Sequence, residues 1–147
     1  RGSCAIRPAL RKAGAVSRDY LTVDDVLAIH AEQIERYGGA EGLRDYGQLE
    51  AAVARPRSGY YADICGEAAA LWESLSQNHP FVDGNKRMAF SAMYRFLALN
   101  DVVVAADADE AWGFLSRAYE EREVVYSMLK NWLTKNTMVR TQRGAGL

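Results

Sequence analysis

The sequence predicts an all-α fold, a helical bundle built around one buried helix. Apolar residues recur at helical spacing through most of the chain, and capping residues, glycines or prolines separate the helical stretches. One short extended segment, residues 101–104, interrupts the helices. With 147 residues and near-average apolar and charged fractions, the chain has the length of one domain with a sizeable core.

The first predicted helix begins after Thr22 and ends at Gly38. Thr22 can cap its first turn, and glycine is common at the position where a helix stops. The residues expected on its inward side are Val26, Ile29, Gln33 and Ile34. His30 lies on the same helix, and we expect it at the surface or at its boundary, with no catalytic role.

Two further helices are expected before the middle of the chain. Asp45 can cap a short helix that runs through Ala54 and stops before Pro56. The next runs from Glu67 to Gln77, with four residues inward: Ala70, Leu71, Ser74 and Leu75.

The central helix is predicted to begin at Asn85, because the residues that follow are helix formers with apolar side chains too dense for a solvated helix. His79 to Gly84 should form a shaped loop before it, since Pro80 disfavours helix at His79 and Gly84 permits backbone angles closed to other residues. Phe81 is expected to anchor this loop in the core.

Two helices are expected towards the end of the chain. Asp107 or Asp109 can cap one that runs to Glu120, and Glu123 to Lys135 forms the last.

The charge distribution suggests three parts. Residues 1–18 carry five basic residues and residues 124–147 carry four, both without an acid, whereas the rest holds nine basic against nineteen acidic residues. We expect residues 1–18 to be an N-terminal extension or expression remnant, 19–135 the domain, and 136–147 a basic tail. No groove-reading motif accompanies the basic ends, so no specific nucleic-acid partner is expected.

Composition also limits the class of protein. Cys4 and Cys65 are too few for a disulfide framework or a metal cluster, and we expect both to be reduced. No apolar run approaches the ~20 residues of a membrane span, and no secretory pattern opens the chain. We therefore expect no membrane association and a cytoplasmic location.

The loop and the start of the central helix combine the chemistry of a phosphate site. The free N–H groups of a first helical turn attract anions, and Lys86 and Arg87 add two cations there. Asp83 would repel a phosphate unless a divalent cation, most naturally Mg²⁺, bridges the two. A neutral imidazole at His79 can accept the proton of an attacking hydroxyl at neutral pH.

Residues 79–87, His-Pro-Phe-Val-Asp-Gly-Asn-Lys-Arg, resemble the Fic family signature in the form of its death-on-curing (Doc) branch. The segments 20–27 and 42–50 also resemble that branch and stand in its usual order, so the resemblance covers roughly residues 19 to 135. It implies the Fic-fold helical bundle with a short extended flap. The motif needs seven defined residue types at fixed spacing, which makes it specific.

The resemblance implies a role for each motif residue. His79 would be the general base, Asp83 the magnesium ligand, and Gly84, Asn85, Lys86 and Arg87 the nucleotide-phosphate site. The catalytic set would thus be His79, Asp83, Lys86 and Arg87.

Two positions depart from the wider Fic pattern. Lys86 replaces a glycine and Phe90 replaces a second arginine that clamps distal phosphates. In the Doc branch this implies an inverted nucleotide whose γ-phosphate faces the target hydroxyl. The implied activity is an ATP-dependent Ser/Thr kinase that phosphorylates a threonine of elongation factor Tu and arrests translation.

The resemblance also implies how target and toxin are handled. Residues 57–64 lack helical periodicity, and we expect them to fold over the site as the flap that aligns an extended target segment, with Tyr60 and Tyr61 either clamping a ligand or packing under the loop. A prevent-host-death-type antitoxin is the implied partner in a toxin–antitoxin module. Ser116 to Glu120 matches an internal inhibitory motif only in part, and we interpret it as a coincidence.

Two other functions stay open at this point. A Fic-type AMP transferase shares the same loop, provided that Lys86 can swing clear of the nucleotide. A catalytically silent module would keep the fold as a partner scaffold. Taken singly, each loop residue is more often structural, and it is their combination that favours a functional site.

Overall fold

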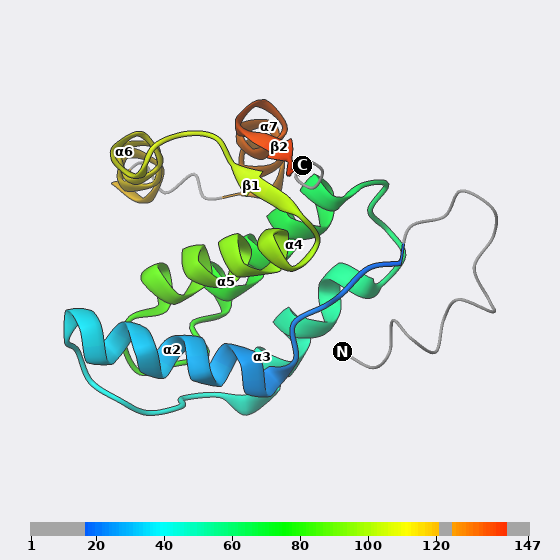
Figure 1. Cartoon of the computed structure of the whole chain (residues 1–147). Helices are drawn as coiled ribbons and strands as arrows, with labels where there is room; N and C mark the ends of the chain where they lie inside the picture. Colours follow the sequence, from blue (N-terminus) through cyan, green and yellow to red (C-terminus); the bar gives the residue numbers. More distant parts are fainter. Residues whose placement is uncertain (1–16, 121–124, 141–147) are drawn as a thin grey trace.

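The computed structural model describes residues 17–120 and 125–140 (Figure 1). Its elements in chain order are α2 (Val23–Tyr37), α3 (Tyr46–Ala54), the 3-10 helix η2 (Arg55–Arg57), α4 (Ile64–Asn78), α5 (Asn85–Leu99), β1 (Val102–Val104), α6 (Ala108–Glu120), α7 (Tyr126–Asn136) and β2 (Thr137–Val139). The predicted all-α bundle is confirmed.

Helix starts are fixed by side chains that bind the free N–H groups of the first turn. At α2, Asp25 N–H donates to Thr22 Oγ1 at 3.0 Å and Thr22 N–H donates to the Asp25 carboxylate at 2.8 Å, a reciprocal capping box. Asp45 caps α3 as predicted. Asp63 caps α4 through Gly66 N–H at 2.9 Å, so α4 begins three residues before the predicted Glu67.

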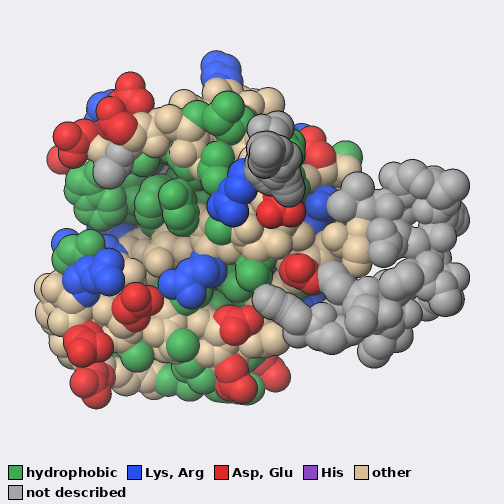
Figure 2. All heavy atoms as spheres, viewed as in Figure 1, with side chains coloured by type: hydrophobic (Ala, Val, Ile, Leu, Met, Phe, Trp, Pro, Cys, Tyr) green, Lys and Arg blue, Asp and Glu red, His purple; other side chains and the backbone are tan. Residues whose placement is uncertain are grey.

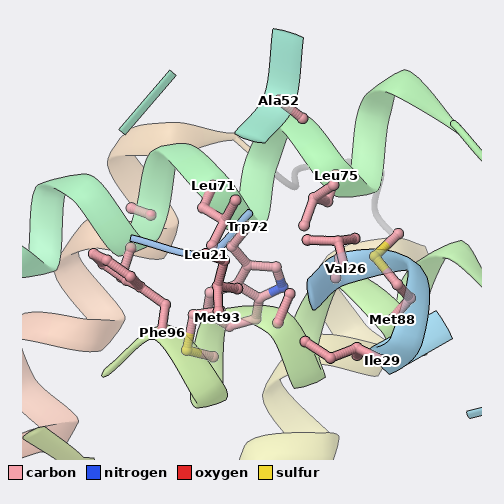
Figure 3. Close-up of a cluster of buried hydrophobic side chains, with 14 of the residues drawn as sticks. Leu21, Val26, Ile29, Ala52, Leu71, Trp72, Leu75, Met88, Met93 and Phe96 are labelled. Carbon is pink, nitrogen blue, oxygen red and sulfur yellow. The ribbon is translucent and has the colours of Figure 1, made fainter. Parts of the chain in front are cut away.

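The helices are arranged around the α4–α5 pair (Figure 1). Helix α2 packs on α5, whereas α3 and α7 pack on α4. Trp72 of α4 is fully buried near the middle of the core, among side chains that α2, α3 and α5 point into the same cluster (Figure 3). The predicted central helix is therefore α5, paired with an α4 that is buried along most of its length.

The short extended segment is a strand rather than a plain connection. β1 pairs with β2 in antiparallel register, with Val102 opposite Val139 and Val104 opposite Thr137. Placing residues 137–139 in a basic tail was therefore wrong: backbone pairing extends the folded domain through β2.

The domain also extends slightly beyond its predicted N-terminal boundary. Arg18 pairs with Glu67 of α4, with Nε and Oε1 2.6 Å apart, so Arg18 belongs to the folded part. The rest of the predicted extension, residues 121–124 before the last helix, and residues 141–147 of the predicted tail lie outside the described residues. Among the described residues Cys65 is a free thiol, and Cys4 lies outside them. Among the described helices, none has the length and apolar character needed to cross a membrane.

Candidate active site between α4 and α5

His79 ends α4 in a left-handed backbone conformation, with φ 48° and ψ 58°. This conformation is unfavourable for a residue with a Cβ, and such strain persists where surrounding contacts enforce it. The turn stops the helix and leaves the imidazole exposed at the entrance of the loop. The predicted base is thus presented to solvent and free to meet a substrate.

Arg44 supports that strained turn. Its Nε donates to the His79 carbonyl oxygen at 2.6 Å and its Nη2 donates to the Asn78 carbonyl oxygen at 2.9 Å. The last carbonyls of a helix have no partner within the helix, and a guanidinium can bind two of them at once. Residues 42–50 resemble the Doc branch, but nothing in that resemblance indicates this contact.

The segment before α3 runs antiparallel to residues 79–84, which we call the motif loop. Leu43 and Phe81 form a β-bridge, flanked by Val82 N–H donating to Gly42 O at 2.9 Å and Arg44 N–H donating to Pro80 O at 2.7 Å. Gly42 has φ +126°, which disfavours a side chain there. Residues 38–45 are therefore the extended segment beside the site.

Residues 57–64 do not fold over the site, so that prediction was wrong. They precede α4, whereas the motif loop follows it, and a 15-residue helix spans about 22 Å. Tyr61 instead accepts a hydrogen bond from Arg55 Nε at 2.7 Å and packs against Tyr126 of α7. Tyr60 is 87% exposed at the same end.

His30 contacts the motif loop on its buried side, through Phe81 and Asp83. It is 5% exposed, and its ring stacks on Phe81 with centroids 3.7 Å apart. Its Nε2 lies 2.7 Å from the Asp83 carbonyl oxygen, which can only accept, so Nε2 carries the proton. The expectation of a surface or boundary histidine was wrong. The available signal was spacing, since His30 is four residues from both Val26 and Ile34 on the buried stripe of α2.

Phe81 is the core anchor that the sequence predicted, with 2% of its surface exposed. Asn85 fixes it by two hydrogen bonds: Phe81 N–H donates to Asn85 Oδ1 at 3.0 Å, and Asn85 Nδ2 donates to the Phe81 carbonyl oxygen at 2.9 Å. The Asn85 side chain is therefore directed into the loop. Both polar atoms of its amide thus have partners within the loop.

Asp83 is an exposed carboxylate held by two backbone groups. Ala40 N–H donates to its Oδ2 at 3.1 Å and Gly84 N–H donates to its Oδ1 at 2.9 Å. These bonds favour the charged form and lower the pKa of Asp83 below its ordinary value. Each oxygen retains a lone pair for a cation.

Gly84 precedes α5 with φ +75°, and a Cβ there would lie 3.1 Å from Ile34 Cδ1. Glycine is therefore required by both backbone and packing. Among the described residues no side chain caps α5, so the N–H groups of its first turn face outward without a side-chain partner. The anion site predicted at this helix end is therefore not occupied by a capping side chain of the described residues.

Lys86 and Arg87 leave α5 in different directions. Lys86 Nζ lies 4.6 Å from the ring centroid of Tyr119, near the end of α6. The Arg87 guanidinium lies 4.6 Å from the ring centroid of Tyr37 and 5.9 Å from that of Trp112. Both side chains are exposed, and aromatic faces hold both cations close to the helix end.

Comparison with protein families matches a region that contains all of the predicted site residues. The sequence profile of the Fic/DOC family matches residues 20–97. A protein named Toxin Doc, from Mycolicibacterium smegmatis, is 47% identical over 96 residues, which are 62% of this chain and 72% of that protein. A protein named Protein kinase doc, from Escherichia phage P1, is 33% identical over 89 residues, 58% of this chain and 71% of that protein.

Proposed function

The chain belongs to the Fic/DOC family, and we propose from this premise that it is a Doc-like toxin whose ATP-dependent kinase activity phosphorylates a threonine of elongation factor Tu. The names of the two relatives, one a toxin and the other a protein kinase, support this assignment. The observation that carries it is the grouping of an exposed imidazole, an ionised carboxylate and an uncapped helix end within one nine-residue stretch, 79–87.

The phosphates of ATP would bind at the start of α5. The N–H groups of Asn85, Lys86 and Arg87 belong to its uncapped first turn, and the helix dipole adds to the attraction. Lys86 and Arg87 can swing from their aromatic contacts to the transferring phosphoryl group, because both side chains are exposed. Gly84 keeps this end free of a side chain.

Asp83 fits the requirements of a magnesium ligand. Mg²⁺ is commonly held by one or two carboxylates together with substrate phosphates and water, and the lowered pKa of Asp83 keeps that carboxylate charged. Among the described residues no group of three or more His, Cys, Asp or Glu side chains could hold a metal without a substrate. A bound Mg²⁺ would supply charge neutralisation between Asp83 and the phosphate oxygens.

His79 would act as the general base of the transfer. Its imidazole takes the proton of the target hydroxyl as that oxygen forms a bond to the γ-phosphorus, and the bond from the γ-phosphorus to the bridging oxygen of ADP breaks. Lys86, Arg87 and the first-turn N–H groups stabilise the charge that builds on the leaving phosphate.

The target would be aligned by the segment 38–45. Because one edge of this segment pairs with the motif loop through Leu43 and Phe81, its other backbone edge can receive an extended peptide by β-augmentation. Backbone pairing places a hydroxyl near His79 with little demand on the target sequence.

The regulatory partner we propose is a prevent-host-death-type antitoxin. The relative named Toxin Doc supports a toxin–antitoxin role, and disordered antitoxin segments can fold when they bind. Growth arrest on expression of this chain should therefore be relieved by coexpression of its antitoxin.

The first test is label transfer to elongation factor Tu from ATP in the presence of magnesium. Label from γ-³²P-ATP but not from α-³²P-ATP, lost in His79→Ala, is the expected result. Transfer of α-label would identify an AMP transferase instead. Absence of any label that depends on His79 would contradict the proposed target or the activity itself, and a proteome-wide search for phosphorylated protein would separate these two cases.

A further inference from the structure

The ammonium group of Lys86 rests on an aromatic ring rather than beside a carboxylate. Its Nζ lies 4.6 Å from the ring centroid of Tyr119, within the ~6 Å reach of a cation–π contact. None of the ion pairs among residues 17–120 and 125–140 includes Lys86. The Tyr119 ring therefore supplies the attraction that holds this cation.

Tyr119 is fixed more firmly than the other aromatic residues beside this helix end. Its hydroxyl shares a 2.7 Å hydrogen bond with Ser76 of α4, which is 4% exposed, and its ring packs against the hydrophobic core. By contrast, Tyr37 and Trp112, whose rings face the arginine that follows Lys86, are 53% and 44% exposed. Figure 2 shows hydrophobic side chains gathered next to α6, with Lys and Arg side chains close by. The packing of α6 on α4 thus decides where the Lys86 ammonium rests.

This contact suits a helix end that holds no anion. No side chain of the described residues caps the first turn of α5, and the positive end of the helix dipole there repels an ammonium. Arg87 adds a second positive charge next to Lys86. A ring face attracts a cation without placing a negative group in the site, so the N–H groups stay available. A bound phosphate would reverse this balance, because its charge attracts an ammonium more strongly than a neutral ring does.

We propose that Tyr119 determines the affinity of the phosphate site, because its ring holds Lys86 aside until a polyphosphate draws the ammonium away. This inference rests on the proposed function, in which Lys86 stabilises the transferring phosphoryl group. A contact made only without ligand opposes binding, since a ligand shifts an equilibrium by its differential affinity for the two states. Removing the ring should therefore tighten phosphate binding, whereas damage to the fold would weaken it. Tyr119 lies outside the family match at residues 20–97.

Binding of inorganic tripolyphosphate to the whole protein in magnesium tests this restraint, because the probe reports on the phosphate site without a protein target. Tyr119→Leu should lower the Kd about two- to fivefold, which corresponds to the loss of an exposed cation–π contact. Tyr119→Phe, which keeps a ring, should stay close to the parent. Lys86→Met should raise the Kd, and adding Tyr119→Leu to it should have no further effect. Tyr60→Leu, at an exposed tyrosine before the start of α4, is the matched control and should bind as the parent does.

Nuclear magnetic resonance of the parent protein gives a second measurement that does not depend on how well a Tyr119 variant folds. The ε-methylene protons of Lys86, assigned by their loss in Lys86→Met, should resonate upfield of those of the other lysines because of the Tyr119 ring current. Saturation with tripolyphosphate should return them towards the ordinary lysine position. An ordinary position in the free protein, or an upfield position that persists at saturation, would overturn the inference.

The binding outcomes separate this restraint from the proposed function. An unchanged or raised Kd in Tyr119→Leu, shown to be folded by circular dichroism, would overturn the restraint and leave the phosphate site intact if Lys86→Met still weakens binding. An equal effect of Tyr119→Leu with and without Lys86 would also overturn it, by giving the ring a structural role only. If Lys86→Met binds as the parent does, the role of Lys86 in the proposed function fails and the restraint fails with it. A parent that binds neither tripolyphosphate nor ATP would contradict both.

Discussion

At the scale of single residues, the site depends on one backbone conformation that the chain would not adopt by itself. His79 is left-handed, which costs of order 1–3 kcal/mol for such a residue, and the contacts of Arg44 to Asn78 and His79 hold it. Under the proposed mechanism, an imidazole held in this way is preorganised for the hydroxyl that it would deprotonate. Asp83, at the other end of the loop, is held equally well by two backbone N–H groups.

His79→Ala should lower kcat about 10²–10⁴-fold, because general-base assistance is lost, and leave the Kd of ATP unchanged. Steady-state phosphorylation and equilibrium binding measure the two quantities. A comparable loss of nucleotide affinity would show that His79 binds rather than catalyses.

Arg44→Ala should lower kcat by about ten- to a hundredfold with little change in the KM for ATP, because the imidazole is displaced while the phosphate site remains. Arg44→Lys, which cannot bind both carbonyls with a planar fork, should recover only part of the activity. The matched control is Arg36→Ala, an exposed arginine of α2 whose partner is Glu32. Equal activity of the Arg36 and Arg44 alanine variants would refute the positioning role.

Asp83→Asn should weaken ATP binding in magnesium and leave binding in excess EDTA unchanged, because the substitution removes charge but keeps a hydrogen-bond acceptor. Since the pKa of Asp83 is lowered, its carboxylate should support magnesium-dependent binding down to a pH of about 4, where an ordinary aspartate is half protonated. Titration calorimetry over pH tests both statements, with Asp24→Asn on α2 as control. A magnesium effect that survives in Asp83→Asn would exclude this residue as the ligand.

At the scale of elements, the motif loop connects α4 to α5 and is held by contacts from three other parts of the chain. The 38–45 segment pairs with one side of it, His30 stacks beneath Phe81, and Asn85 closes it from the first residue of α5. Phe81 is thereby fixed inward, whereas His79 and Asp83 of the same loop are exposed.

Asn85→Ala should lower the free energy of unfolding by about 1–3 kcal/mol, because the substitution leaves the buried Phe81 N–H and carbonyl groups without these partners. It should also lower activity through a loosened loop. Urea unfolding measures the change, with Asn131→Ala, an exposed position on α7, as the control. An unfolding curve that matches the parent's would mean that the loop does not need this closure.

At the scale of the whole molecule, α6 completes the site although it lies beyond the family match. Tyr119 joins α6 to α4 through a 2.7 Å hydrogen bond with Ser76, and its ring contacts Lys86. The proposed phosphate site is thus bordered both by α5, from the matched region, and by a helix outside it.

Stability of the whole molecule should fall in alkali through two tyrosines. Burial raises the pKa of Tyr119, against the effect of its Ser76 bond, and burial together with Glu67 raises that of Tyr20. Because both folded-state pKa values exceed the unfolded value near ~10, this stability is complete below pH ~10 and is lost as pH rises through the folded values.

A variant with both Tyr20→Phe and Tyr119→Phe should therefore show a shallower fall in Tm between pH 9 and 11, the range that brackets the ~10 of an ordinary tyrosine. Tyr60→Phe, at an exposed position, should follow the parent. The assignment fails if the double variant loses Tm as steeply as the parent.

Features that depend only on neighbouring residues could be predicted from the sequence. Thr22 and Asp45 cap helices as predicted because a cap reaches only three residues along the chain, and Phe81 is buried as its apolar character required. Tertiary structure decided the rest: His30 binds Asp83 across 53 residues and Arg44 binds His79 across 35. Such contacts depend on how α2 and the 38–45 segment pack against the loop, which local spacing does not encode. Residues 57–64 were misassigned for the same reason. They are close to the motif in sequence, but they lie at the start of α4 and the motif lies at its end.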